Sequence, residues 1–100
     1  MPEMSKRTAK KLLANVPDEY AFRFHDGHIL RNVGELRDAL RAMQNDRFAF
    51  HANAEKNDFS KWVREVIGDQ KLARDLERAP TRTKAAKKVA DRATFLSSKL

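Results

Sequence analysis

Positively charged side chains at the two ends of this 100-residue chain are the residues whose type and spacing most suggest a chemical role. Residues 1–16 carry four Lys or Arg against one acid, and residues 80–100 carry six against one. Residues 17–79 hold eleven against twelve, so the net charge of +7 comes from the ends. Clustered cations attract phosphates without base-specific contacts. We therefore expect nucleic acid, DNA or RNA, to contact nine residues: Lys6, Arg7, Lys10, Lys11, Arg82, Lys84, Lys87, Lys88 and Arg92.

Histidines offer a second kind of chemistry. His25 and His28 flank Asp26-Gly27, and two imidazoles on one face of a tight turn can bind zinc or nickel if His51 or an acid adds a third ligand. Structural zinc sites take four ligands, however, and the chain has no cysteine. Two solvated histidines beside a turn is the simpler interpretation, so we predict no metal and no cofactor.

The sequence carries no pattern typical of catalysis. We find no Ser-His-Asp arrangement, and the three glycines are too scattered to form a phosphate-binding loop. The absence of cysteine excludes disulfides and thiol catalysis and fits a cytoplasmic protein. No apolar run is long enough to cross a membrane. We predict a cytoplasmic protein that is not an enzyme and has no membrane partner.

Alternating residues predict a small antiparallel sheet. Residues 20–31 are typical of a hairpin, because Asp26-Gly27 favours a two-residue turn. That turn pairs Phe24 with Ile29, and it leaves Leu30 on the face of Arg23, away from the row of Phe side chains. Residues 47–51 alternate again and predict a third strand, since three strands with one apolar face can be stable where a lone hairpin is not.

Apolar residues at helical spacing predict helices over residues 6–15, 32–44, 58–67 and 69–79, and a basic helix after Pro80. Side chains that favour the N-terminal cap position precede each of them. These are Ser5, Asn32, Asn57 or Asp58, Asp69, and Thr81 or Thr83. Gly68 suits the left-handed conformation that ends a helix.

The expected fold class is α+β, with about three antiparallel strands packed against helices. Charge divides the chain into a basic N-terminal arm at 1–16, a globular domain at 17–79 and a basic C-terminal helix or tail at 80–100. The apolar stripe of the last helix is narrow and rich in alanine, so we expect this helix to fray or to pack only near Phe95 and Leu96.

One segment resembles a small uncharacterised domain of archaeal and bacterial proteins. The domain has the pattern Phe-x-x-His, then Asn-Asp-Phe-x-x-Trp, then Gly-Asp-x-x-Leu-Ala. Here the residues that carry the resemblance are Asp58, Phe59, Trp62, Gly68, Asp69 and Leu72. The resemblance implies a domain over about residues 20–79, and it implies no activity. Caps, turns and packing account for most of these positions without a ligand.

Two functions follow from these observations. The first is a small non-enzymatic protein that contacts the phosphates of DNA or RNA through its basic ends, with low sequence specificity. The alternative is a protein–protein interaction module or a homodimer whose basic ends are passive, because a charge run is often only a solvated helix face.

Overall fold

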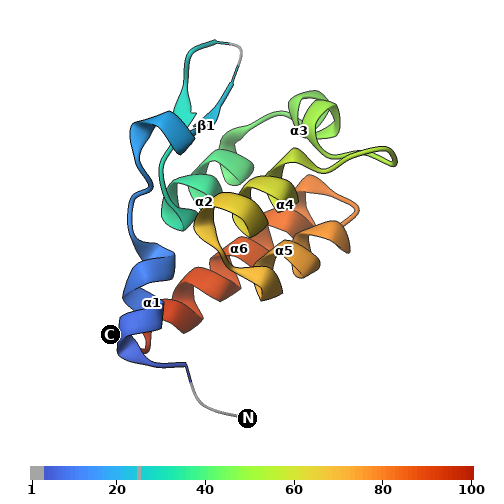
Figure 1. The fold of residues 1–100 in the computed structure, drawn as a ribbon. Coiled ribbons are helices and arrows are strands. Elements are labelled where there is room, and N and C mark those ends of the chain that lie inside the picture. The colour runs from blue at the N-terminus through green and yellow to red at the C-terminus, as the bar shows by residue number, and fades with distance from the viewer. Residues whose placement is uncertain (1–3, 25) are drawn as a thin grey trace.

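Helix α6 (Arg82–Ser97) is the longest helix of the computed structural model, and α1, α2 and α5 all pack against it (Figure 1). The structure describes residues 4–24 and 26–100. The remaining elements in chain order are α1 (Lys6–Leu13), the short 3₁₀ turn η1 (Asp18–Tyr20), β1 (Phe22–Arg23), β2 (Ile29–Leu30), α2 (Val33–Ala42), α3 (Asn45–His51), α4 (Asp58–Trp62), the π-helical turn η2 (Val63–Ile67) and α5 (Gln70–Glu77). The described part of the chain is therefore mostly helical, with one two-stranded antiparallel sheet, which is a broadly α+β fold.

The caps predicted from sequence begin their helices as expected. In each case a side-chain oxygen accepts a hydrogen bond from the backbone N–H three residues later, which satisfies a donor that the first helical turn leaves unpaired. The pairs are Ser5 with Thr8, Asn32 with Glu35, Asn57 with Ser60, Asp69 with Leu72, and Thr81 with Lys84. Gly68 has φ of 90° and ends the helical segment that contains α4 and η2, as its lack of a side chain predicts.

The hairpin exists, but the predicted register is wrong by one residue. Phe22 lies opposite Leu30 and Arg23 lies opposite Ile29. The backbone N–H of Phe24 donates to the carbonyl of His28 at 2.9 Å, so Phe24 pairs with His28 in place of the predicted Ile29. A one-residue shift moves every side chain of a strand to the other face. The observed register places Leu30 beside Phe22 in the core, where Leu30 is buried. The predicted position of His25 opposite His28 lies outside the described residues.

The predicted third strand is also wrong, because residues 45–51 form helix α3. Phe48 and His51 are both buried, and three residues apart they share one face of a helix. Phe50, which a strand would place beside Phe48, is 54% exposed. A run of five alternating residues fits both structures, and burial of His51 against the hairpin selects the helix.

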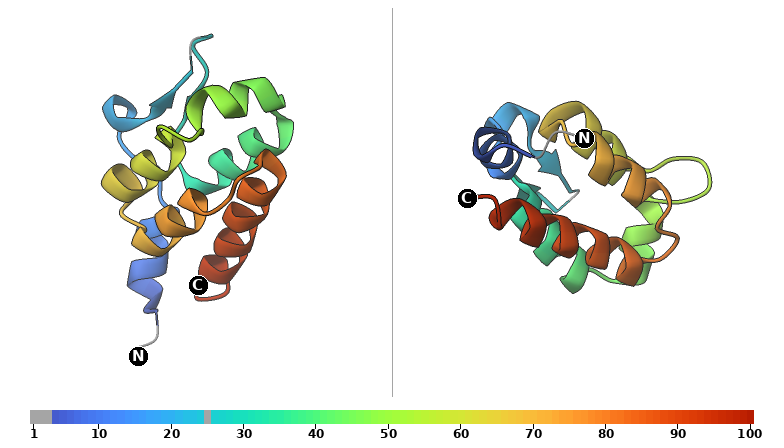
Figure 2. Two further views of the ribbon diagram at one scale, coloured as in Figure 1. Left: turned by 90° about the vertical axis from the view of Figure 1, so that its right-hand side faces the viewer. Right: turned by 90° about the horizontal axis from the view of Figure 1, so that it is seen from below.

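Both segments predicted as arms contribute to the hydrophobic core. Ala9 and Leu12 of α1 are buried, and so are five residues of α6: Ala85, Ala86, Val89, Ala93 and Leu96. The small side chains that predicted a frayed helix instead let the backbone of α6 approach its neighbours closely. Figure 2 shows α6 (red) as a long helix in the lower part of the molecule, and it packs against α1, α2 and α5. Residues of both terminal segments therefore share one hydrophobic core with residues of the segment 17–79.

This packing predicts that α6 is required for stability. Leu96→Ala should lower the free energy of unfolding by about 2–5 kcal/mol, because it opens a cavity at a fully buried position. Leu100→Ala makes the same chemical change at a side chain that is 54% exposed, and it should shift stability by no more than about 0.5 kcal/mol. Urea unfolding followed by circular dichroism compares the two. Equal effects would show that α6 does not dock as described.

Candidate functional site

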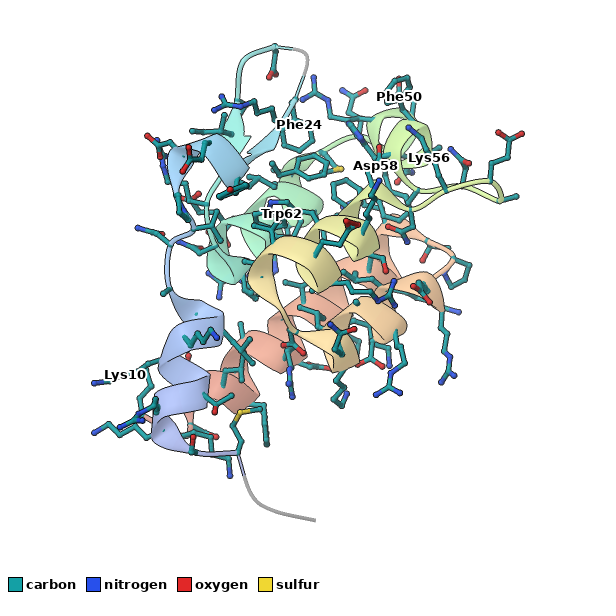
Figure 3. All side chains as sticks on the ribbon, viewed as in Figure 1. Lys10, Phe24, Phe50, Lys56, Asp58 and Trp62 are labelled. Carbon is teal, nitrogen blue, oxygen red and sulfur yellow. The ribbon has the colours of Figure 1, made fainter. Side chains whose placement is uncertain are left out.

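Helix α1 presents the most concentrated group of available cations. Lys6, Arg7, Lys10 and Lys11 are exposed, and none forms an ion pair with the described residues. Ala9 and Leu12 fix their orientation, because burying that side of the helix turns the cations to the opposite side. Lys10 points away from the body of the molecule (Figure 3). We call these four side chains the α1 cation group.

Helix α6 adds a smaller exposed set. Lys84, Lys87 and Lys88 are exposed on its outer side. Lys87 makes a 2.8 Å ion pair with Asp91 one turn later, whereas Lys84 and Lys88 pair with no acid of the described chain. An exposed i,i+4 pair is weak and exchanges readily with solvent, so Lys87 can still meet an anion.

The two arginines predicted for this interface have structural partners instead. Arg82 donates from Nη1 to the carbonyl of Leu40 at 2.8 Å and from Nε to Asn45 at 2.9 Å, which ties α6 to the end of α2. Arg92 makes a bidentate pair with Asp69 at 2.7 and 3.1 Å. The side chains of Arg92 and Asp69 are 10% and 1% exposed. Phosphate contact by Arg92 would require this buried pair to open, so we leave both arginines out of the candidate interface.

Phe95 is an exposed aromatic side chain close to two cations, and the sequence alone did not identify it as part of the site. Phe95 is 41% exposed, and the charged groups of Arg92 and Lys99 lie 5.3 and 5.1 Å from its ring centre. Helical spacing carries part of the signal: Arg92 is three residues before Phe95 and shares its side of α6, and Lys99 follows just after the helix ends at Ser97. An exposed ring next to cations can stack on a nucleic-acid base.

A second group of residues surrounds His51. Its Nδ1 lies 2.9 Å from Oδ2 of Asp58, and Nζ of Lys56 lies 3.0 Å from the same oxygen. Phe22, Phe24 and Phe59 pack around the imidazole with ring centres 5.3–5.4 Å away. From the sequence, Asp58 was expected only to cap a helix. Its pairing with His51, seven residues earlier, appears only in the folded structure.

The ionised form of Asp58 is favoured in the folded protein. Partial burial by itself would raise the pKa of this carboxyl group, but hydrogen bonds from His51 and Lys56 together outweigh it and hold the pKa below its ordinary value of 3.8. The carboxylate in turn orients the imidazole, since a hydrogen bond at Nδ1 fixes which edge of the ring faces outward.

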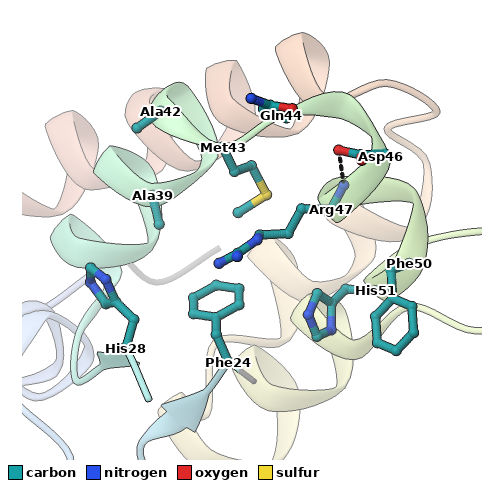
Figure 4. A pocket seen from close by; sticks show the side chains of 10 residues that line it. All are labelled: Phe24, His28, Ala39, Ala42, Met43, Gln44, Asp46, Arg47, Phe50 and His51. Carbon is teal, nitrogen blue, oxygen red and sulfur yellow. Dashed lines mark hydrogen bonds between the residues drawn. The ribbon is translucent and has the colours of Figure 1, made fainter. Parts of the chain in front are cut away.

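A cavity of about 760 Å³ opens beside His51, between the hairpin, α2 and α3. Phe24 and Met43 provide apolar wall, and the polar groups include His28, Arg47 and His51. The guanidinium of Arg47 lies 5.3 Å from the ring centre of Phe24, and Figure 4 shows it reaching across the cavity toward that ring. Asp26 holds one nitrogen of Arg47 at 3.2 Å.

The structure gives no further support for a metal site within residues 4–24 and 26–100, where no three His, Cys, Asp or Glu side chains gather closely enough to hold an ion. His25 lies outside this part of the chain, so its pairing with His28 on a metal stays untested. Over the same residues, no helix combines the length and apolar character that crossing a membrane requires.

Comparison with known proteins does not assign the chain to a family. No protein-family model matches it, no curated protein is significantly similar to it, and no solved structure matches its fold. The geometry of its own residues therefore carries the functional argument.

The pair between His51 and Asp58 predicts a pH-dependent contribution to stability. Because the folded-state pKa of Asp58 is lowered, the stabilisation is present above the ordinary value of 3.8 and is lost as the pH falls through the folded-state value. Asp58→Asn keeps the shape and the oxygen acceptor but removes the charge. We expect this variant to be less stable than the parent at pH 7, and the difference to shrink at pH 3. Urea unfolding at both pH values measures it; an equal difference at both would contradict the role of the charge.

Proposed function

We propose that this protein binds DNA or RNA through the α1 cation group and the exposed lysines of α6, without strong base specificity and without a catalytic step. One observation carries the proposal: Lys6, Arg7, Lys10 and Lys11 lie on two turns of one helix and pair with no acid of the described chain. An isolated ion pair already lowers the positive potential around a surface cation, and α1 itself contains no acid that would do so.

Elsewhere, many surface cations have acidic neighbours. Arg31 pairs with Asp18, Lys71 with Asp75, and Arg64 with Glu77. Neutralised pairs of this kind attract phosphates weakly, because the anion must displace a carboxylate. The contrast supports α1 as the main point of phosphate contact.

Exposure of Phe95 favours single-stranded over double-stranded nucleic acid as the ligand. A ring that is 41% exposed beside Arg92 and Lys99 can stack on an unpaired base, and base stacking on aromatic side chains tolerates any sequence. Bases of a duplex are already stacked on one another. We therefore expect single strands to bind at least as tightly as duplexes of equal charge. The proposal takes the protein to be cytoplasmic, where RNA is abundant.

A salt titration of nucleic-acid binding tests the proposal. We compare the parent with a variant in which the α1 cation group is replaced by glutamine. For duplex DNA, log Kobs falls with log salt by about 0.9 per neutralised phosphate. Loss of four contacts should therefore reduce the slope by up to about 3.6 and weaken binding at low salt at least about tenfold. Fluorescence anisotropy with labelled generic DNA and RNA provides the measurement.

The matched control removes the same charge from another surface. Lys61, Lys71, Arg74 and Arg78 are exposed on or next to α4 and α5, and replacing them with glutamine also lowers the net charge by four. This variant should keep most of the affinity. If both variants bind alike, the α1 cation group is not the interface. If the parent protein binds neither DNA nor RNA at low salt, the proposal is wrong. The alternative is then a protein–protein interaction module whose cations have no binding role.

Substitution is required here because truncation is not informative. Removing residues 80–100 would delete five buried residues of the core together with the lysines. A truncated chain that failed to bind would only have lost its fold.

A further inference from the structure

We propose that the cavity between the hairpin, α2 and α3 binds a small aromatic carboxylate that also carries a hydroxyl group. This inference is independent of nucleic-acid binding, because the residues that carry it belong to neither α1 nor α6. Its parts are an apolar chamber, a guanidinium inside that chamber and a buried, oriented imidazole at its wall.

The chamber has the size and the walls of a small-molecule site. Its volume of about 760 Å³ lies within the range of about 300–1,000 Å³ that is usual for such pockets. Phe24, Ala39, Ala42 and Met43 form much of the wall. Phe24 offers an aromatic surface, and the thioether of Met43 adapts to the outline of a ring. These walls favour a planar apolar body over a sugar or a free phosphate.

Arg47 supplies the group that recognises an anion. Its guanidinium has five N–H donors, and Asp26 approaches one of its terminal nitrogens at 3.2 Å. The carboxylate of Asp46 accepts from the backbone N–H of Arg47 at 2.8 Å, so this contact uses none of the guanidinium donors (Figure 4). Donors therefore remain for a ligand. A ligand carboxylate can accept from these remaining donors without displacing Asp26, which holds only one nitrogen of the guanidinium.

His51 supplies the second polar contact. The residue is 7% exposed, and its Nδ1 is engaged by Asp58 at 2.9 Å. The imidazole borders the cavity beside Phe24 and Arg47 (Figure 4), and its opposite nitrogen, Nε2, makes no hydrogen bond with the described residues. A neutral imidazole that donates from Nδ1 to a carboxylate presents an acceptor at Nε2. A ligand hydroxyl can donate to it, and the aromatic packing around the ring keeps this acceptor in place.

A titration with three probes followed by ¹H–¹⁵N NMR tests the proposal. 4-Hydroxybenzoate carries the aromatic body, the carboxylate and the hydroxyl; benzoate lacks the hydroxyl, and 4-hydroxybenzyl alcohol lacks the charge. We expect 4-hydroxybenzoate to shift resonances of the cavity residues saturably, with a dissociation constant of about 1 mM or lower. Each of the other probes should bind at least about fivefold more weakly, and the side-chain resonances of His51 should respond most to the probes that carry a hydroxyl.

Arg47→Gln tests the anion contact at an exposed position that can change without unfolding the protein. The substitution should weaken the binding of 4-hydroxybenzoate about tenfold or more and leave the binding of 4-hydroxybenzyl alcohol nearly unchanged. Arg74→Gln, which removes an exposed arginine of α5 outside the cavity, should bind like the parent. The proposal is overturned if 4-hydroxybenzoate produces no saturable shift at the cavity, if it binds no better than benzoate, or if the two arginine variants behave alike.

Discussion

The buried pair between Asp69 and Arg92 is the interaction on which the rest of the fold depends. Asp69 accepts from the N–H of Leu72 and thereby begins α5, and its two oxygens also receive the guanidinium of Arg92 from α6. The carboxylate is 1% exposed, so water cannot replace either partner. Losing one member of such a pair typically costs about 3–5 kcal/mol, because the other charge is left buried without compensation. The pair therefore fixes the rotation of α6 about its own axis and its position along α5.

That constraint decides which side of α6 faces the core and which side faces solvent. With Arg92 turned toward Asp69, Val89 and Ala93 face the core, and Lys84, Lys87 and Lys88 remain outside. Helix α6 in turn supports α1, whose buried side packs against it. Cations on docked helices lose less conformational freedom on binding than cations on flexible tails, so a fixed surface can bind a polyanion more tightly for the same charge. The fold thus places the basic ends of the sequence on two docked helices.

Local chemistry made part of this structure predictable, and tertiary contacts decided the rest. The caps at Asn32 and Asp69 and the end of the helix at Gly68 depend on residues within one turn, so the sequence contains all that is needed. The hairpin register depends on burying Leu30 beside Phe22, and a favoured turn dipeptide gives no information about that. The alternating pattern of residues 47–51 is compatible with a strand and with a helix. Packing of His51 among aromatic rings decides between them, and that packing exists only in the folded protein.

The candidate site shows the same division. Exposure of Lys6 and Lys10 follows from the spacing of apolar residues in α1. The ion pair that removes Arg92 from the predicted phosphate contacts involves Asp69, which lies 23 residues away in sequence. The cavity beside His51 is formed by three segments that are separate in sequence. Spacing within one helix therefore predicts which cations are exposed, whereas a cavity between distant segments forms only after the elements have packed.

Native-state hydrogen exchange of the α6 amides tests most directly whether α6 belongs to the core. If it does, the amides of Val89, Ala93 and Leu96 exchange only when the whole protein unfolds, with the same free energy of opening as the most protected amides of α2. Exchange of the α6 amides at a clearly lower free energy, with α2 still protected, would mean that α6 detaches as a separate arm and would contradict the account.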